Sequence, residues 1–155
     1  MIMTGKIAGV PWKIMIDNYF PNKLILDRKV MKDMEDVWVE VNGRNVLMDF
    51  VQAYGYDTQG ACYQEIVKQN TGLILPFVLG VATKQECPDK KLIEIEQEYL
   101  DEALEDIKAH APRYWDIIQG KIQPVGCGHC PACRARNKVE GVVSYRKLFR
   151  EKEDE

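Results

Sequence analysis

The sequence predicts an α/β fold with a mixed central β-sheet flanked by helices. Short runs rich in Ile, Val and Leu alternate with two stretches of helical period, and turn-forming residues separate them. The chain has 155 residues, a net charge of -3 and 46% hydrophobic residues, which suits one domain with its own core. We expect the main core in residues 1–122, a cysteine-rich segment of the same domain in 123–150 and a disordered tail in 151–155.

The first two predicted strands are VPWKIMID (residues 10–17) and KLILDRKV (residues 23–30). Pro21 and Asn22 lie between them, and both residue types favour turns. We therefore expect these two strands to pair as a hairpin. The segment that follows, up to residue 56, is mixed, with a turn expected at Asn42-Gly43.

The rest of the chain predicts two helices and two more strands. A helix is expected from Asp57 to a glycine stop at Gly72, because apolar residues recur at 62, 63, 66 and 67. Residues 73–84 are almost wholly apolar and predict a central strand. In residues 90–97 apolar and polar residues alternate, which predicts a strand with one solvent-exposed face. Residues 98–120 predict an amphipathic helix, kinked or broken near Pro112.

Composition and charge exclude several classes of protein. The positive and negative charges nearly balance, so no basic tail indicates nucleic-acid binding. The longest apolar run, residues 72–82, is too short to span a bilayer and contains a proline. No secretory signal is visible, so we expect a cytoplasmic protein without a membrane partner.

Two aspartates and a lysine lie in the predicted hairpin, where charges are costly to bury. Asp27 and Lys29 are two residues apart and should share one face of a strand, while Arg28 points away. Asp17 on the partner strand could reach the same place. Converging carboxylates are the ligands that Mg²⁺ prefers. The common alternative is a cross-strand ion pair at a sheet edge. However, the apolar neighbours of Asp27 predict that it is buried, and burying a charge that has no functional role costs free energy.

Gln59 and Tyr63 are spaced four residues apart on the first predicted helix and should project from one face of it. An amide and a phenol there could bind a phosphate or orient a catalytic group. Alone, this spacing is common on helix surfaces.

Taken together, these motifs resemble the PD-(D/E)xK nuclease superfamily, in particular its RecB-like and phage-exonuclease branch (lambda exonuclease and exodeoxyribonuclease VIII). The resemblance rests on Asp17, on ILDRK with Asp27 and Lys29, and on QGACY with Gln59 and Tyr63, and covers residues 5–148. The cysteine-rich end, CGHCPACRARNKVEGVVSYRKL, is also similar to that of phage and prophage exonucleases.

The resemblance implies a restriction-endonuclease-like core that lacks the usual N-terminal helices. It implies that Asp17, Asp27 and the backbone carbonyl of Arg28 bind Mg²⁺ (or Mn²⁺), that Lys29 positions or helps deprotonate the attacking water, and that Gln59 and Tyr63 support the site. The expected reaction is hydrolysis of phosphodiester bonds by a double-strand DNA exonuclease in phage recombination. Expected partners are DNA, a phage single-strand annealing protein and further copies of the chain.

Cys127, Cys130 and Cys133 form a C-x2-C-x2-C pattern. Thiolates at this spacing select zinc or an iron–sulfur cluster, and His129, Cys87 or Cys62 could supply a fourth ligand. Some RecB-like nucleases carry a 4Fe–4S cluster with three of its cysteines at the C-terminus. The plain alternative is three reduced, unligated thiols.

Two further functions are compatible with the sequence. One is a catalytically impaired DNA-binding or assembly module of the same fold. The other is a thiol-metal-binding adaptor in which the acids of the hairpin are only structural.

Overall fold

The central sheet of the protein has four strands in the order β3-β4-β7-β8. These strands are β3 (Asn18–Phe20), β4 (Leu24–Met31), β7 (Phe77–Thr83) and β8 (Lys90–Ile95). The middle pair, β4 and β7, is parallel, and both outer pairs are antiparallel. The sheet is therefore mixed, as the sequence predicts, and the apolar strand β7 is central.

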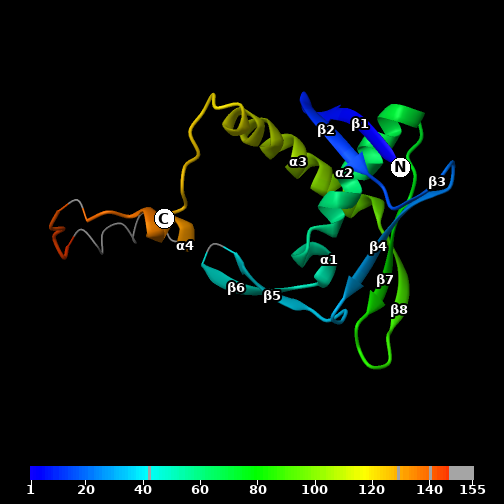
Figure 1. Ribbon diagram of the computed structural model, residues 1–155, viewed down its shortest axis with the longest axis horizontal. Helices are drawn as coiled ribbons and strands as arrows, with labels where there is room; N and C mark the ends of the chain where they lie inside the picture. The colour runs from blue at the N-terminus through cyan, green and yellow to red at the C-terminus, as the bar shows by residue number, and fades with distance from the viewer. Residues whose placement is uncertain (42, 129, 140, 147–155) are drawn as a thin grey trace. The chain divides into compact units, whose positions relative to one another are not determined.

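The computed structural model describes residues 1–41, 43–128, 130–139 and 141–146. Figure 1 shows the chain with its elements labelled. The chain divides into two compact units, Met1–Lys121 and Ile122–Glu155. The first unit holds the sheet and the long helices, and the second holds the cysteine pattern.

The predicted hairpin of residues 10–17 with residues 23–30 is wrong. Strand β2 (Val10–Met15) pairs instead with a strand that precedes it, β1 (Ile2–Ile7), in a separate sheet of two strands. The two are joined by Ala8 and Gly9, which both have positive φ angles, of 48° and 79°. Such a two-residue connection matches the twist of paired strands.

The predicted turn at Pro21-Asn22-Lys23 does form, but it joins β4 to the short strand β3. Asp17 therefore lies between β2 and β3 and is not part of a long strand. The strand β1 was hard to predict because Gly5 interrupts its apolar residues. A Cβ atom on Gly5 would lie 2.5 Å from Gln69 Oε1 and 2.7 Å from Ile66 Cδ1, so glycine lets this strand pack closely on a helix.

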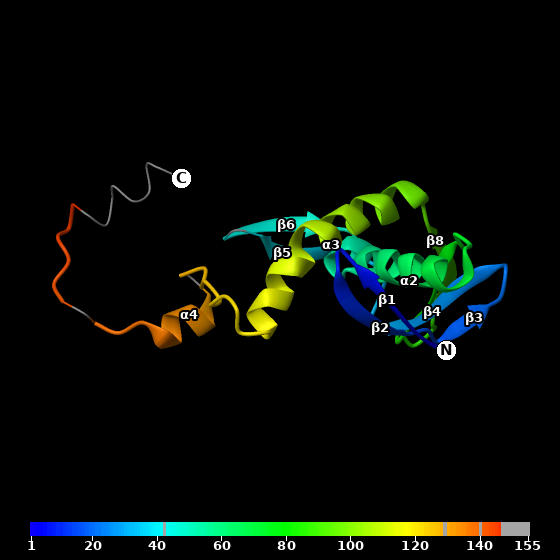
Figure 2. The same cartoon turned by 90° about the horizontal axis from the view of Figure 1, so that it is seen from above.

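Two long helices pack on one face of the central sheet. Helix α2 (Tyr56–Thr71) ends at Gly72, whose φ of 76° suits a glycine C-cap, as predicted. Helix α3 (Gln97–Ile118) runs through Pro112 without ending there. Figure 2 shows α2 lying beside the β1–β2 hairpin and beside α3. The largest fully buried side chains lie between these layers: Ile16, Ile25, Ile66, Val67, Phe77, Leu79 and Leu100.

A second hairpin follows the central strand β4. It consists of β5 (Val37–Val41) and β6 (Arg44–Met48), and a short helix, α1 (Phe50–Ala53), comes after it with Asp49 as its N-cap. Gly43 in the connection has a φ of 75°. Asn42 of the predicted turn lies outside the described residues. The order of elements is thus longer than the simple β-β-α-β-β-α order that the sequence suggests.

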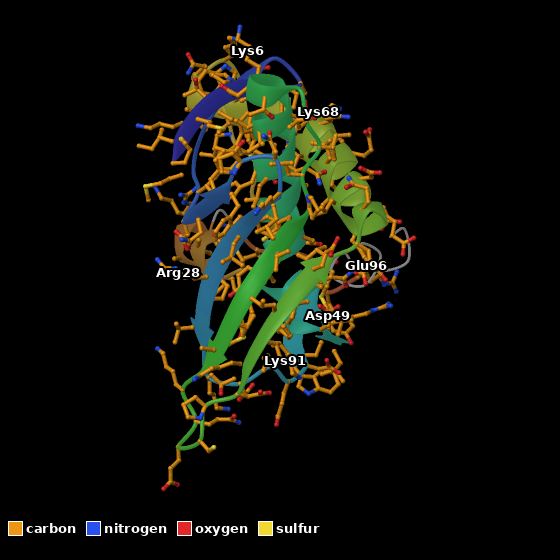
Figure 3. All side chains as sticks on the ribbon, turned by 90° about the vertical axis from the view of Figure 1, so that its right-hand side faces the viewer. Lys6, Arg28, Asp49, Lys68, Lys91 and Glu96 are labelled. Atoms are coloured by element: carbon orange, nitrogen blue, oxygen red, sulfur yellow. The ribbon has the colours of Figure 1, made fainter. Side chains whose placement is uncertain are left out.

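The opposite face of the central sheet is open within Met1–Lys121. Figure 3 shows β4, β7 and β8 in front, with α2 and α3 behind them. Side chains on this face include Leu92, which is 77% exposed, and Val30, which is 65% exposed. Arg28 projects on this same side, because it alternates with Asp27 and Lys29 along β4.

The unit Ile122–Glu155 contains one short helix among its described residues, α4 (Pro131–Arg136), with Cys130 as its N-cap. The tail of residues 151–155, predicted to be disordered, lies outside the described part of the chain. Across the described residues, no helix combines the length and the apolar character needed to cross a bilayer.

Candidate active site

Asp27 is the buried acid of the central sheet. It lies in the middle of β4 and its side chain, only 3% exposed, points toward α2. The residues on either side along this face, Ile25 and Lys29, contact the same layer because side chains alternate along a strand. A carboxylate placed there needs partners, since an unpaired buried charge is costly.

Lys29 and Gln59 provide those partners. The Lys29 ammonium lies 2.7 Å from Asp27 Oδ2, and it donates a hydrogen bond of 2.8 Å to Gln59 Oε1. Gln59 Nε2 in turn donates to Asp27 Oδ1 at 2.9 Å. Three side chains from one strand and one helix thus form a closed ring of polar contacts around the buried acid, here called the Asp27 centre.

One oxygen of the Asp27 centre is poorly satisfied. Asp27 Oδ2 is buried and accepts no hydrogen bond of good geometry, although the Lys29 ammonium is close to it. This oxygen is held by the ion pair with Lys29 rather than by a well-aligned hydrogen bond. Carboxylate and carbonyl oxygens are the ligands that a hard divalent cation such as Mg²⁺ prefers.

Asp17 lies at the edge of β4, next to the peptide that joins Asp27 to Arg28. Its Oδ2 accepts a hydrogen bond of 3.2 Å from the Arg28 N–H. The partner strand β3 begins at Asn18, opposite Leu26, so its pairing with β4 stops before Arg28. Within a strand, the N–H and the C=O of one residue point to the same edge. The Arg28 carbonyl therefore points to the edge where Asp17 lies.

Tyr63 is held apart from the ring of contacts around Asp27. Its hydroxyl donates a hydrogen bond of 2.8 Å to the carbonyl of Met15, and its ring packs edge-on against Phe77. Met15 is the last residue of β2 and is two residues before Asp17. Tyr63 thus fixes the segment that carries Asp17, whereas Gln59 contacts Asp27 itself.

Tyr56 belongs to the same site, although no motif in the sequence predicts this. The Lys29 ammonium lies 4.6 Å from the centre of the Tyr56 ring. Tyr56 is the first residue of α2 and comes three residues before Gln59. Helical spacing from Gln59 was the available signal, but no sequence motif extends the pattern toward Tyr56.

The three cysteines of the C-x2-C-x2-C pattern come together in the second unit. The sulfur atoms of Cys127, Cys130 and Cys133 all lie within 4.8 Å of one another. The backbone N–H of Cys130 donates to Cys127 Sγ at 3.3 Å, and that of Cys133 donates to Cys130 Sγ at 3.4 Å. A Cβ atom on Gly126 would lie 2.7 Å from Cys133 Sγ, so the chain at Gly126 passes close to this sulfur.

Soft sulfur ligands at this spacing fit zinc or an iron–sulfur cluster. The pKa of Cys133 is raised: a hydrogen bond with the Gly128 backbone lowers it, but the neighbouring thiols of Cys130 and Cys127 raise it by more. The predicted fourth ligand His129 lies outside the described residues. Cys62, another candidate, lies in the core of the first unit, where burial raises the pKa of its thiol to about 11.

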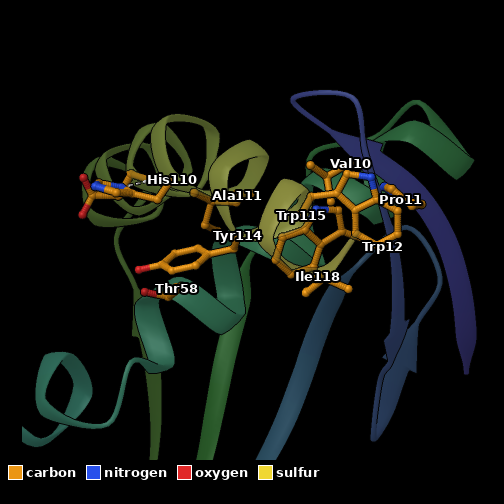
Figure 4. Close-up of a pocket in the computed structure, with 11 residues that line it drawn as sticks. Val10, Pro11, Trp12, Thr58, His110, Ala111, Tyr114, Trp115 and Ile118 are labelled. Atoms are coloured by element: carbon orange, nitrogen blue, oxygen red, sulfur yellow. Dashed lines mark hydrogen bonds between the residues drawn. The ribbon is translucent and has the colours of Figure 1, made fainter. Parts of the chain in front are cut away.

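A largely apolar groove of about 590 Å³ lies between β2 and α3. Figure 4 shows Trp12 on one side of it, with Tyr114, Trp115 and Ile118 on the helix. Thr58 on α2 also lines the groove and precedes Gln59 of the Asp27 centre. Asp27 and Lys29 do not line the groove.

A mixed sheet with a buried acid and a lysine two residues apart on a central strand defines the PD-(D/E)xK class of nuclease folds. The chain belongs to the family described as a PDDEXK-like domain of unknown function (DUF3799), whose model matches residues 1–136. This confirms the superfamily that the sequence motifs suggest. Comparison with curated proteins gave no match.

One similar solved structure is that of a protein from Eubacterium rectale, described as "Putative exonuclease". The two chains are 41% identical, and their structures superpose with a TM-score of 0.79. The alignment covers 96% of this chain and 55% of the other chain. The present chain therefore spans about half the length of that relative.

Proposed function

We propose that this chain is a divalent-metal-dependent deoxyribonuclease, and specifically an exonuclease that hydrolyses double-stranded DNA. The observation that carries the proposal is the Asp27 centre: a buried acid on a central strand, paired at 2.7 Å with the ammonium of the lysine two residues later and contacted by Gln59. The family match and the description of the Eubacterium rectale protein as "Putative exonuclease" support the same reaction.

In this proposal Asp17, Asp27 and the backbone carbonyl of Arg28 hold Mg²⁺, or Mn²⁺ in its place. When bound, the metal supplies positive charge for the attacking and leaving oxygens of phosphodiester hydrolysis. Asp27 is a fixed ligand because β4 is held on both sides, by β3 and β7, and Asp17 is tied to β4 by its hydrogen bond with the Arg28 N–H.

Lys29 has a separate role beside the ligands. Its ammonium orients the attacking water or the scissile phosphate, or its positive charge favours the loss of a proton from that water to a base. Gln59 keeps Asp27 and Lys29 at their present spacing by contacting both. Tyr63 holds the end of β2, and through it the segment with Asp17.

The test is a nuclease assay on linear duplex DNA with Mg²⁺ or Mn²⁺. Asp27→Asn removes the ligand charge at constant size, and Lys29→Met removes the ammonium, so each should abolish most of the activity. The surface pair of Lys32 and Asp33, 3.1 Å apart, is the matched control, and Lys32→Met or Asp33→Asn should leave activity unchanged. An inactive wild type, or full activity in Asp27→Asn, contradicts the proposal. A closed circular duplex that is cut as fast as linear DNA contradicts exonuclease action.

The cysteine pattern supports a second cofactor, zinc or a 4Fe–4S cluster, at Cys127, Cys130 and Cys133. Metal analysis of purified protein separates these two, because only the cluster gives iron, sulfide and visible absorption. The triple change of these cysteines to serine should remove the metal, whereas Cys87→Ser should not. Metal-free wild type under anaerobic purification contradicts this assignment.

The biological setting is proposed from the family resemblance alone. It is DNA recombination of the phage type in the cytoplasm, with a single-strand annealing protein as partner and with the nuclease assembled from several copies. Co-purification with such a protein, and the mass of the nuclease by light scattering, would test the two partners. Metal-independent DNA binding that survives Asp27→Asn in an inactive wild type would instead favour a non-catalytic DNA-binding module.

A further inference from the structure

Tyr56 supplies the only aromatic contact that the described residues give to the Lys29 ammonium. The ring centroid lies 4.6 Å from Lys29 Nζ, within the range of a cation–π interaction. The side chain of Lys29 is 20% exposed, so water has limited access to the ammonium. Such an interaction is stronger when the cation is partly desolvated.

The ring of Tyr56 is itself held in place. Gly55, with a φ of 65°, precedes it and starts helix α2, so the position of Tyr56 follows from the position of the helix. The ring of Tyr54 packs against that of Tyr56 with 5.8 Å between centroids and a tilt of 42°. Because both the backbone and the ring of Tyr56 are held in place, the ring can restrict the position of the Lys29 ammonium.

Helical spacing places Tyr56 on the same face of α2 as the two residues of the Q-x-x-x-Y pattern. Tyr56, Gln59 and Tyr63 stand at positions i, i+3 and i+7. Gln59 contacts the Lys29 ammonium from one position on this face, and Tyr56 contacts it one turn earlier. The face of α2 that carries these site residues is therefore described by the longer pattern Y-x-x-Q-x-x-x-Y.

We propose that Tyr56 is a positioning residue that holds the Lys29 ammonium beside Asp27 through its ring. Without the ring, Lys29 keeps its ion pair with Asp27 and its hydrogen bond with Gln59, but the side of the ammonium that now faces the ring is open to water. The long lysine side chain then has further rotamers, and the ammonium spends less time where the reaction needs it. This inference rests on the proposed nuclease function for its kinetic consequence, but not for the contact itself.

The kinetic test compares three variants. Tyr56→Leu removes the ring and keeps an apolar side chain, and should lower kcat by about three- to thirtyfold, with KM for DNA changed by less than twofold. Tyr56→Phe keeps the ring without the hydroxyl and should retain at least half of the wild-type kcat. Tyr114→Leu is the matched control, because Tyr114 is an exposed tyrosine on α3. It should behave as the wild type does.

The spectroscopic test needs no activity. An ammonium above an aromatic ring places the neighbouring Cε protons in the shielding region of the ring. In protein with ¹³C-labelled lysine, the Cε–H resonance of Lys29, assigned by its loss in Lys29→Gln, should lie upfield of the other lysines. The displacement should remain in Tyr56→Phe and disappear in Tyr56→Leu.

The outcomes separate the two proposals. A Lys29 resonance without an upfield displacement in the wild type overturns the positioning role, and this measurement does not depend on whether Tyr56→Leu folds. Equal loss of kcat in Tyr56→Phe and Tyr56→Leu also overturns it, because the hydroxyl and not the ring would then be the active part. A wild type with no activity and a displaced resonance overturns the nuclease proposal and the kinetic consequence, while the contact stands.

Discussion

The amide of Gln59 contacts both charged groups of the buried pair, donating to Asp27 Oδ1 at 2.9 Å and accepting from Lys29 Nζ at 2.8 Å. An amide is suited to this position because it carries one donor group and one acceptor atom. It therefore satisfies a negative and a positive partner at once without adding charge to the site. A carboxylate or an ammonium at residue 59 would repel one of the two.

Replacing Gln59 tests this arrangement. Gln59→Leu leaves Asp27 Oδ1 buried without its hydrogen bond, which should lower the free energy of unfolding by about 1–3 kcal/mol. Nuclease activity should fall more than tenfold, because Lys29 loses its second anchor. Gln59→Glu should also lose activity, since it places a second carboxylate beside Asp27. Urea denaturation and the duplex DNA assay measure the two effects.

Gln69 on the same helix gives the matched control. It hydrogen-bonds the backbone of Lys6 and so ties α2 to β1, away from the Asp27 centre. Gln69→Leu should lower stability but leave activity near the wild-type value. Equal losses of activity in the two leucine variants would mean that stability alone, and not the contact with Asp27, explains the effect of Gln59→Leu.

Tyr63 should contribute to activity less than Gln59 does. Tyr63→Phe removes the hydroxyl that donates to the Met15 carbonyl, and a single hydrogen bond of this kind contributes about 0.5–1.5 kcal/mol. We expect a loss of stability of that size and a two- to fivefold loss of activity, through looser positioning of Asp17. Thermal denaturation and steady-state kinetics on the same preparation measure both. A loss of activity as large as that in Gln59→Leu, at unchanged stability, would indicate that the hydroxyl acts directly on the substrate.

Gly60→Ala should destabilise the protein although alanine is the better helix former. A Cβ atom at residue 60 would lie 2.5 Å from Phe77 Cδ1 and 2.9 Å from Leu100 Cδ2. Helix propensity favours alanine by about 1 kcal/mol, but overpacking a dense core costs about 1–3 kcal/mol. Because the Cβ contact with the Phe77 ring is very short, we expect overpacking to dominate and the free energy of unfolding to fall by up to about 2 kcal/mol, measured by urea denaturation.

Gly80 provides the comparison for Gly60, since a Cβ atom there would meet side-chain atoms only at 3.5 Å or more. Gly80→Ala should therefore leave stability within about 0.5 kcal/mol of the wild type. If Gly60→Ala is as stable as the wild type, α2 lies farther from β7 than the structure indicates.

The sequence predicted the part of the fold that local patterns determine. The turn at residues 21–23, the helix that ends at Gly72 and the apolar central strand β7 all follow from residue type and spacing, and all are present. Pairing between strands is not determined locally. Residues 10–15 have a suitable partner on either side in the sequence, and the Ala8-Gly9 turn brings the earlier one, β1, into register.

The candidate site likewise combines contacts that local sequence patterns predict with contacts that depend on tertiary packing. Asp27 and Lys29 share a face because strand geometry requires it, and Gln59 reaches them from α2. The contact of Tyr63 with the Met15 carbonyl could not be predicted, because it depends on how β2 packs against α2. Tyr56 joins the site through a ring contact that depends on the same packing.

Cys62 gives a prediction of pH dependence. It is buried in α2, and burial raises the pKa of its thiol from 9.0 to about 11. Below pH 9 the thiol is neutral in both the folded and the unfolded chain, so it adds no pH dependence. Between pH 9 and pH 11 the unfolded chain releases this proton while the folded chain keeps it, so stability falls as pH rises, by at most about 1.4 kcal/mol per pH unit.

Removing the thiol should therefore flatten the alkaline part of the stability profile. Cys62→Ala is less stable than the wild type at pH 8, because it loses buried contacts, and the difference should shrink between pH 9 and pH 10.5. Cys87→Ala changes an exposed thiol and should follow the wild type throughout. Urea denaturation at four pH values measures the three curves. Parallel curves for the wild type and Cys62→Ala would mean that the thiol ionises as easily in the folded chain as in the unfolded chain. That result would contradict the burial of Cys62 on α2.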